Sequence, residues 1–470
     1  MKIRIISVIL LMSVVLTACS DSVEFEQEQE TIAETTTVTS TSTTTSGTSG
    51  TMSPTTTTEV VTEITTTQAA TQATTVITTP VTIPKATKKP KQPKPPSPPV
   101  HKPVVADEVI GVWISYLELA TVLTGKTESQ FRQNYAAMLD NCRTLGINTV
   151  YVHLRPFGDA LYESDYFPWS RIVTGEVGKK PAFDPLKVML EETHKRNISF
   201  HGWLNPMRLM NDTDMKKVSQ THAIGKWYND SSKRGTYIVK HGDRWFFNPA
   251  YKEVTDLIGN GAMEIAAKYN VDGIHIDDYF YPTTDNSFDN AAFNASPQTS
   301  RKQFRFNNVN NMVNTMYSST KKGNPNALFG ISPQASIENN YNKLYADVET
   351  WCKKKGYADY IIPQFYYGFN NPAQPYVECV NRWQEMLKGS HVKLMFGLAV
   401  YKIGVEDEWA GSASREWITD KQILKRQIQE ARKTASYNGV VFFSYNNLFN
   451  PSSSVKKAVN DEIAAFKPIL

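Results

Sequence analysis

Eight short apolar runs, rich in β-branched and aromatic residues, recur along the chain from about residue 107 onward. None alternates strictly between apolar and polar positions, which is typical of parallel strands that are buried on both faces. We expect strands at residues 111–116, 148–155, 199–205, 272–277, 328–333, 360–366, 393–401 and 439–445.

Longer segments with apolar residues at helical spacing separate these runs and follow the last one. We expect helices at residues 128–145, 185–196, 250–269, 300–320, 347–355, 376–387, 420–436 and 453–466. Eight strand–helix pairs in succession predict the α/β class and a single (β/α)8 barrel of the TIM type with enlarged βα loops. A doubly wound open sheet is the alternative.

The first hundred residues lack this pattern. Lys2 and Arg4 precede an apolar run over residues 5–16, and LTAC follows at residues 16–19. Such a segment is typical of a secretory signal, and its resemblance to the bacterial lipobox implies cleavage before Cys19 and lipid attachment to that thiol. We therefore expect a lipoprotein signal peptide at residues 1–19 and an extracytoplasmic protein that is lipid-anchored to the cell membrane.

Residues 20–106 are dominated by Thr and Ser and then by Lys and Pro. A segment of this composition, without an amphipathic period, buries too little apolar surface to offset the entropy lost on folding. We expect a disordered linker there and one catalytic domain over residues 107–470.

Composition and motifs exclude several classes of function. The formal net charge is +4, and no basic helix with interleaved aromatic residues indicates a nucleic-acid partner. We find no Gly-rich phosphate loop, no metal-ligand cluster and no G-x-S-x-G motif of an esterase or amidase. We expect no cofactor, no metal and a monomer. The remaining cysteines should be buried free thiols: Cys142, Cys352 and Cys379.

Two adjacent acids, Asp277 and Asp278, end the fourth predicted strand within DGIHIDDYFYP at residues 272–282. In a TIM-type barrel the chemistry lies at the carboxyl ends of the strands. Strand alternation predicts that Asp277 and His275 face the barrel mouth, while the isoleucines face the helices. Asp278 should then brace a loop or a neighbouring backbone amide.

The other strand ends carry amide, guanidinium, carboxyl and aromatic groups, which suit sugars because rings stack on pyranose faces while amides and acids bind hydroxyls. Trp113 and Trp203 could equally pack the barrel. Arg155 and Arg208 could bind an anionic substituent of the substrate or form an ion pair with an acid of the protein. The candidate substrate-binding residues are Trp113, Arg155, Asp159, Trp203, Asn205, Arg208, His275, Tyr279, Gln334, Gln364, Tyr366, Tyr401 and Tyr445.

Several ordered motifs resemble the glycosyl-hydrolase-like family 10, also called the domain of unknown function 187 family. They are GVW (111–113), RPFGDALY (155–162), FDPL (183–186), HGWLNP (201–206), NP (248–249), DGIHIDDYFYP (272–282), GISP (330–333) and PQFY (363–366). The resemblance covers residues 107 to about 450. It implies a TIM-type barrel related to the α-amylase and α-galactosidase groups, often on envelope lipoproteins, with some members acting on peptidoglycan glycan strands.

Hydrolysis of a glycosidic bond requires two carboxyl groups. We expect Asp277 to be the nucleophile or base, since its place resembles that of the nucleophile in amylase-like barrels, and Glu338 to be the acid, with Asp159 and Glu118 as alternatives. The function that follows is a surface-anchored glycosidase acting on peptidoglycan or another polysaccharide. The alternative is a carbohydrate-binding barrel of the cell envelope without turnover.

Overall fold

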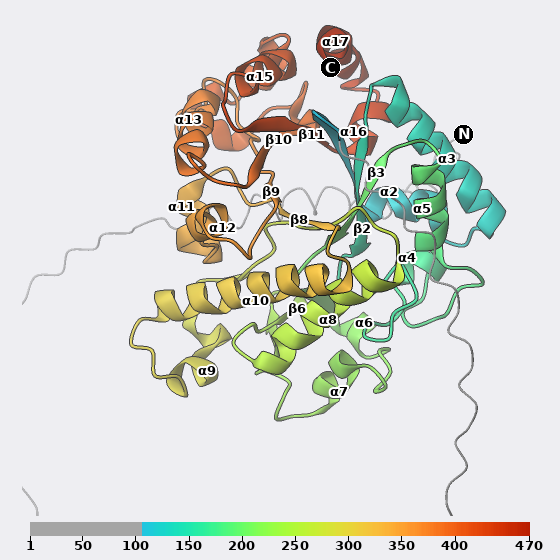
Figure 1. Cartoon of the computed structure of the whole chain (residues 1–470), viewed down its shortest axis with the longest axis vertical. Coiled ribbons are helices and arrows are strands. Elements are labelled where there is room, and N and C mark those ends of the chain that lie inside the picture. Colours follow the sequence, from blue (N-terminus) through green and yellow to red (C-terminus); the bar gives the residue numbers. More distant parts are fainter. Residues whose placement is uncertain (1–105) are drawn as a thin grey trace, which may run out of the picture. The chain divides into compact units, whose positions relative to one another are not determined.

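The computed structural model of the protein describes residues 106–470. Eight parallel strands close into a barrel in the order β1-β11-β10-β9-β8-β7-β3-β2 (Figure 1). Their bounds are β1 Val109–Ile114, β2 Thr149–Arg155, β3 Ser199–Leu204, β7 Gly273–Ile276, β8 Leu328–Ile331, β9 Tyr360–Ile361, β10 Lys393–Ala399 and β11 Tyr437–Phe443. All eight expected strands are confirmed. The predicted signal peptide, Cys19 and all but the last residue of the predicted linker lie outside the described residues.

The first and last strands pair with each other, which closes the sheet. Val109 lies opposite Gly439 and Val112 opposite Phe442, in parallel register. This pairing excludes the open, doubly wound alternative, in which the two edge strands stay apart. Because all eight strands are parallel, the loops that follow them all begin at the same, carboxyl, end of the barrel.

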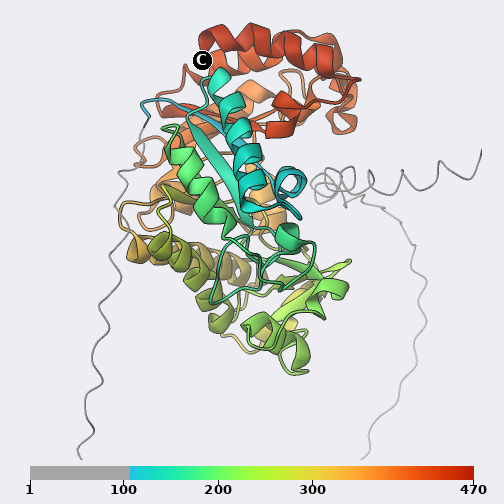
Figure 2. The same ribbon diagram turned by 90° about the vertical axis from the view of Figure 1, so that its right-hand side faces the viewer.

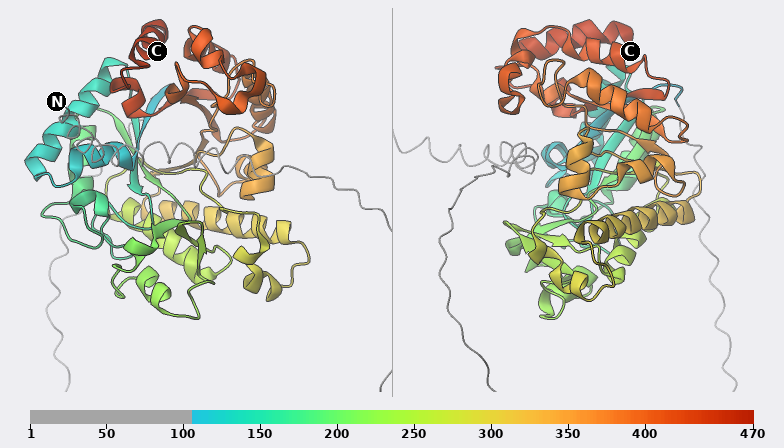
Figure 3. Two further views of the ribbon diagram at one scale, coloured as in Figure 1. Left: turned by 180° about the vertical axis from the view of Figure 1, so that it is seen from behind. Right: turned by 90° about the vertical axis from the view of Figure 1, so that its left-hand side faces the viewer.

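Helices surround the barrel, and α8 and α10 lie side by side along one flank (Figures 1 and 3). The FDPL motif begins α5: Asp184 accepts a hydrogen bond from the Leu186 N–H at 3.0 Å, and Pro185 occupies the first turn. The α-helices are α2 Tyr116–Leu123, α3 Glu128–Thr144, α4 Arg171–Thr174, α5 Pro185–His194, α6 Asp212–Met215, α7 Ala223–Asn229, α8 Lys252–Lys268, α9 Asn290–Asn294, α10 Arg301–Gly323, α11 Ile337–Asn339, α12 Val348–Lys353, α13 Tyr376–Met386, α14 Glu416–Thr419, α15 Ile423–Ala431, α16 Tyr445–Phe449 and α17 Lys456–Phe466.

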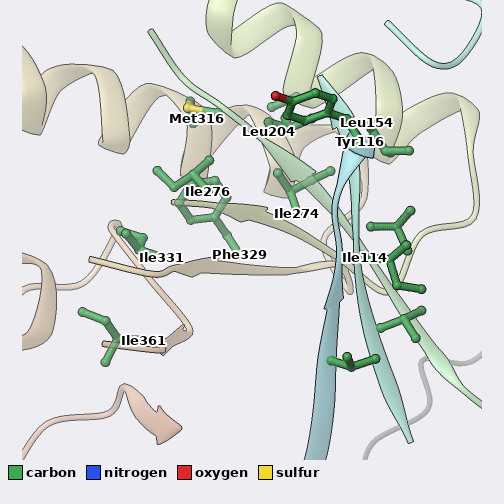
Figure 4. Close-up of a cluster of buried hydrophobic side chains, with 14 of the residues drawn as sticks. Ile114, Tyr116, Leu154, Leu204, Ile274, Ile276, Met316, Phe329, Ile331 and Ile361 are labelled. Carbon is green, nitrogen blue, oxygen red and sulfur yellow. The ribbon is translucent and has the colours of Figure 1, made fainter. Parts of the chain in front are cut away.

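The barrel has two apolar layers. Outside it, side chains such as Ile274 and Ile276 are fully buried in the main core, among side chains that include Met316 of α10 (Figure 4). The interior is instead filled by large rings, among them Trp113, Tyr151, Trp203 and Tyr360. The predicted outward face of the fourth strand is therefore confirmed.

Two motif glycines make room for these interior rings. A Cβ atom at Gly330 would collide with the ring of Tyr360, and one at Gly273 with the ring of His201. Both glycines belong to motifs that carried the family resemblance, GISP and DGIHID. Their role is to let a narrow barrel hold bulky, hydrogen-bonding side chains beneath the candidate site.

The loop after β3 contains an insertion that the hydrophobic pattern did not predict. It is a small antiparallel sheet in the order β4-β6-β5, and it projects from the barrel (Figure 2). Its strands are β4 Arg208–Asn211, β5 Ile238–His241 and β6 Arg244–Phe247. The insertion fixes the backbone at Arg208, a residue of the candidate site.

Three features bear on other expectations. Cys142, Cys352 and Cys379 are buried and free, as predicted. Within residues 106–470 no helix has the length and apolarity needed to cross a membrane. Over the same residues no three His, Cys, Asp or Glu side chains gather in a way that could hold a metal ion.

Candidate active site

Asp277 follows β7 at the carboxyl end of the barrel and is only 3% exposed. Its Oδ2 accepts a hydrogen bond from Trp203 Nε1 of β3 at 2.8 Å. Oδ1 is also buried and accepts no hydrogen bond of good geometry, although the backbone N–H of Tyr279 lies nearby. Burial, reinforced by the charge of Asp278, raises the pKa of Asp277 to about 8.

Asp278 has a different set of partners. Its Oδ2 accepts from Gln334 Nε2 at 3.1 Å and its Oδ1 from Gln364 Nε2 at 3.2 Å. These glutamines follow β8 and β9 and lie opposite each other in a parallel bridge. Burial raises the pKa of Asp278, while the two amide donors oppose that rise. The expected brace exists, but it is built from two side-chain amides rather than from a backbone amide.

The two acids are therefore unequal. Both oxygens of Asp278 face N–H donors, which stabilise the ionised form, and the charge of Asp278 in turn favours the proton on Asp277. At neutral pH Asp277 holds a proton and Asp278 ionises first. Environments that separate two carboxyl groups in this way assign an acid role to one and an anionic role to the other.

Arg208 reaches this pair from the insertion after β3. Its guanidinium lies over the ring of Tyr279, with 4.0 Å between Cζ and the ring centroid, and its Nε donates to the Pro156 carbonyl at 3.2 Å. Its charge opposes the rise in pKa of both Asp277 and Asp278. Arg208 and Tyr279 are thus brought to the site, as the sequence predicted.

A hydrogen-bonded stack of rings forms the floor beneath the acids. Trp113 Nε1 donates to His275 Nε2 at 3.1 Å, and the Tyr360 hydroxyl lies 2.8 Å from His201 Nδ1. Burial lowers the pKa of His275 well below its usual range, so the ring is neutral. His275 was expected to face the barrel mouth with Asp277 and to contact the substrate, but its hydrogen bonds run to Trp113 and Tyr360.

Trp113 and Trp203 pack the barrel, which was one of the two roles expected for them, the other being stacking on a sugar. Trp113 is 2% and Trp203 3% exposed, so neither presents a free face to a sugar. Both pack the barrel interior, and Trp203 also orients Asp277. Trp113 and Trp203 were expected to bind substrate, but their burial gives them a supporting role instead.

His153 of β2 is a site-supporting residue that the sequence analysis did not single out. Its ring stacks on Trp203, with 3.7 Å between centroids, and its Nε2 is hydrogen-bonded to Asn205 Oδ1. Asn205 therefore contributes through His153. Alternation along β2, which places His153 two residues after the inward Tyr151, was the signal that could have found it.

An aromatic edge borders the acids on the side of β9 to β11. Tyr366 is partly exposed, and burial together with the two acids raises its pKa well above the usual range. Its ring is 5.8 Å from Tyr401 and 5.9 Å from Phe443, between centroids. Tyr366 and Tyr401 lie where predicted. Phe443, the last residue of β11, was missed because the sequence does not distinguish an apolar ring at a strand end from a residue of the hydrophobic core.

Arg155 and Asp159 lie elsewhere. Arg155 is fully buried, with its guanidinium 4.4 Å from the Phe167 ring centroid and against Gly261 of α8, so it points outward from the barrel. A register shift between His153 and Arg155 breaks the alternation on which its prediction rested. Asp159 is buried and accepts from the Phe157 N–H at 2.9 Å, which makes it a loop-holding carboxylate.

Tyr445 and Glu118 are also structural. Tyr445 begins α16 instead of ending a strand, and its hydroxyl accepts from Asn141 Nδ2 of α3 at 2.9 Å. Glu118, an alternative acid, is 2% exposed and accepts from Ser444 Oγ at 2.5 Å and from the Asn446 N–H at 2.8 Å. These bonds join the ends of the first and last strands.

Glu338 has properties opposite to those expected of a general acid. Its side chain is 52% exposed and forms an ion pair with Arg382 of α13. Arg382 holds the pKa of Glu338 below its usual range, so the carboxyl group is ionised at neutral pH. The expectation that Glu338 is the acid is corrected on this ground.

The raised pKa of Asp277 predicts a pH dependence of stability. The unfolded chain releases this proton near the usual value of 3.8, whereas the folded chain holds it until about pH 8. The folded state therefore binds more protons across this interval, and its stability falls as the pH rises through it. Asp277→Asn removes this contribution, so the loss of melting temperature from pH 5 to pH 8.5 should be smaller than in the wild type. Glu338→Gln, measured alongside, should keep the wild-type difference.

A closed (β/α)8 barrel with an unequal carboxyl pair at the ends of its strands defines a class, the glycoside-hydrolase-like barrels. The chain belongs to the glycosyl hydrolase-like 10 family, whose sequence profile matches residues 108–411. The resemblance expected from the motifs is confirmed.

Individual relatives agree with this assignment. The chain is similar to glycosyl hydrolase YngK of Bacillus subtilis (strain 168), with 32% identity over 392 residues that cover 77% of this chain and 73% of the relative. It is 28% identical over 379 residues to glycosyl hydrolase DigH of Escherichia coli (strain K12), covering 73% of this chain and 84% of that protein. Among solved structures, the PgaB (BpsB) glycoside hydrolase domain from Bordetella bronchiseptica has a TM-score of 0.45 and 13% identity, covering 76% and 99% of the two chains.

Proposed function

We propose that the protein is a glycoside hydrolase in which Asp277 is the general acid and Asp278 the anionic partner. The observation that carries the proposal is the unequal pair, with one carboxyl group kept protonated by burial and by its neighbour's charge, and the other held by two amides. These roles differ from those expected from the sequence, in which Asp277 was the nucleophile or base, Glu338 the acid and Asp278 a brace. A group with a pKa near 8 is a poor nucleophile at neutral pH and a suitable proton donor.

In this mechanism Asp277 donates its proton to the glycosidic oxygen as the bond from that oxygen to the anomeric carbon breaks. Asp278 stabilises the positive charge that develops on the sugar ring and acts on the opposite side of the reaction, as nucleophile or as base toward water. Arg208 lies near enough to steady the negative charge left on Asp277 after proton transfer. Trp203, which bonds Asp277, holds the acid in place.

We propose that the substrate is an extracellular polysaccharide, and the leading candidate is the glycan strand of peptidoglycan. Support comes from the family membership and from the partly exposed tyrosines and amides beside the acids, which suit hydroxyl and pyranose contacts. The test is to incubate residues 107–470 with peptidoglycan, with and without stem peptides, and with an α-glucan panel, and to identify released fragments by mass spectrometry. Fragments from at least one glycan are expected, and release from none would overturn the proposal.

The pH profile distinguishes the two possible roles of Asp277. If it is the acid, kcat/KM should fall as the pH rises through about 8, because the proton to be donated is lost there. If it is instead the nucleophile, kcat/KM should increase through the same range. Initial rates from pH 4 to pH 10 on the glycan identified in the panel decide between these outcomes.

We also propose that the protein is anchored to the outer face of the cell membrane by lipid on Cys19. The support is the signal-like segment at residues 1–19, with its charged start, apolar run and LTAC site. Fractionation of cells that express the full chain tests this, since the protein should appear with the membranes.

One observation favours a second candidate, a carbohydrate-binding barrel without turnover. Glu338, Glu118 and Asp159, the other acids considered from the sequence, are each bonded to partners outside the pair. Of the acids considered, Asp277 and Asp278, two adjacent residues, are then left to carry hydrolysis. Glycan binding without any released fragment would support this second candidate.

A further inference from the structure

The loop after β10 presents apolar surface to solvent beside the candidate site. Among the described residues, Val405 is 44% and Trp409 42% exposed, and both lie on this loop. The loop contains the 3-10 segments η3 Val400–Lys402 and η4 Glu408–Ala413 before α14 begins. Because it follows a barrel strand, it lies at the carboxyl end, where the acids are.

This loop is held rigidly in place. Lys402 Nζ forms an ion pair with Asp407 Oδ2 at 2.8 Å, and the two side chains are 10% and 1% exposed. The other oxygen of Asp407 accepts from the backbone N–H of Trp409 at 3.3 Å, and the Asp407 N–H donates to the Ser414 carbonyl at 2.8 Å. A buried, hydrogen-bonded ion pair at its base fixes the backbone that carries the indole.

The loop is also tied to the neighbouring loop after β9. Glu416 is buried, and its carboxylate accepts from the backbone N–H groups of Phe369 at 2.7 Å and Asn370 at 3.1 Å. Gly411 lies close to the same neighbouring loop, since a Cβ atom added to it would be 3.5 Å from Pro372 Cγ. The two loops therefore form one wall, and Trp409 is part of it.

Aromatic residues connect this wall with the acids. Tyr366 is close enough to Asp277 and Asp278 for their charges to raise its pKa, and Tyr401, at the start of the loop, contacts Tyr366 at an interplanar angle of 87°. Tyr366 and Tyr401 thus link the acids to the base of the loop that carries Trp409. A rigid, exposed indole has a flat apolar face and loses little entropy on binding, as a sugar-stacking residue requires.

We infer that Trp409 is a stacking platform for a sugar unit beyond the one that is cleaved, and that the substrate is a long glycan chain rather than a short oligosaccharide. The inference rests on the proposed function. A unit bound at Trp409 adds affinity only for chains long enough to span from Asp277 to the wall. Short substrates end before the indole and are indifferent to it.

The test compares Trp409→Ala with Val405→Ala, a matched control that removes the other exposed apolar side chain of the loop. The probes are long peptide-free peptidoglycan glycan strands and a tetrasaccharide prepared from them. Trp409→Ala should lower kcat/KM on the long strands about tenfold, through KM, and leave the tetrasaccharide rate unchanged. Trp409→Phe should recover most of the loss, and Val405→Ala should stay within about twofold of the wild type on both probes. All three variants should melt near the wild-type temperature, because the substituted side chains are exposed.

The outcomes separate the two proposals. Equal losses on both probes, or no loss on the long strands, overturn the platform while leaving the proposed hydrolase intact. If the wild type neither cleaves nor binds either probe, the peptidoglycan assignment fails, and the platform for that glycan fails with it.

Discussion

Asp277→Asn should lower kcat/KM by about 10³-fold, because the amide keeps the shape of the side chain but has no proton to donate to the glycosidic oxygen. The Asn oxygen can still accept the bond from Trp203 Nε1, so the fold and glycan affinity should be retained. Initial rates, a binding isotherm on the same glycan and a melting curve together check this result.

The control for this variant is Glu338→Gln. It removes a carboxylate from the β8 loop without touching the pair, since Glu338 is exposed and bonded to Arg382. We expect its kcat/KM to stay within about twofold of the wild type, as is usual for a surface substitution. An active Asp277→Asn beside an inactive Glu338→Gln would remove Asp277 from the mechanism and return the acid role to Glu338, as the sequence suggested.

Asp278→Asn should also reduce kcat/KM by about 10³-fold, because the anion that stabilises the developing positive charge is lost. It should in addition lower the pKa of Asp277 below its value of about 8, since the charge of Asp278 is one of the causes of that rise. The second effect can be measured without substrate, as a shift to lower pH of the interval in which stability falls.

A double variant adds a further check. If the two acids act as a unit, Asp277→Asn combined with Asp278→Asn should be no slower than the slower single variant. An active but less stable Asp278→Asn, beside an inactive Asp277→Asn, would return Asp278 to the role of a brace. Two fully active single variants would place the chemistry at another strand end.

The sequence by itself determined the barrel. Parallel strands that are buried on both faces appear in the sequence as short continuous apolar runs. The helices between them appear as apolar residues at helical spacing, so both elements can be recognised from local sequence alone. The same pattern located the acids, because Asp277 and Asp278 directly follow the apolar run of β7 and strand ends meet at one end of a barrel. Which residues close the wall at Trp409 could not be read in this way, since irregular loops have no period.

Only the tertiary structure decided the roles of the residues at that end. The pKa of Asp277 depends on its burial, on Asp278 and on Trp203 from another strand, and the ionised state of Asp278 depends on amides contributed by β8 and β9. Arg155 does not lie at the site, because a register shift in β2 turns its side chain toward α8. Glu338 does not act there either, because it forms an ion pair with Arg382, which is distant in sequence. Electrostatic interactions and register shifts involve residues of several strands. The pattern along one strand therefore predicts where a carboxyl group lies, but not whether that group is protonated or ionised.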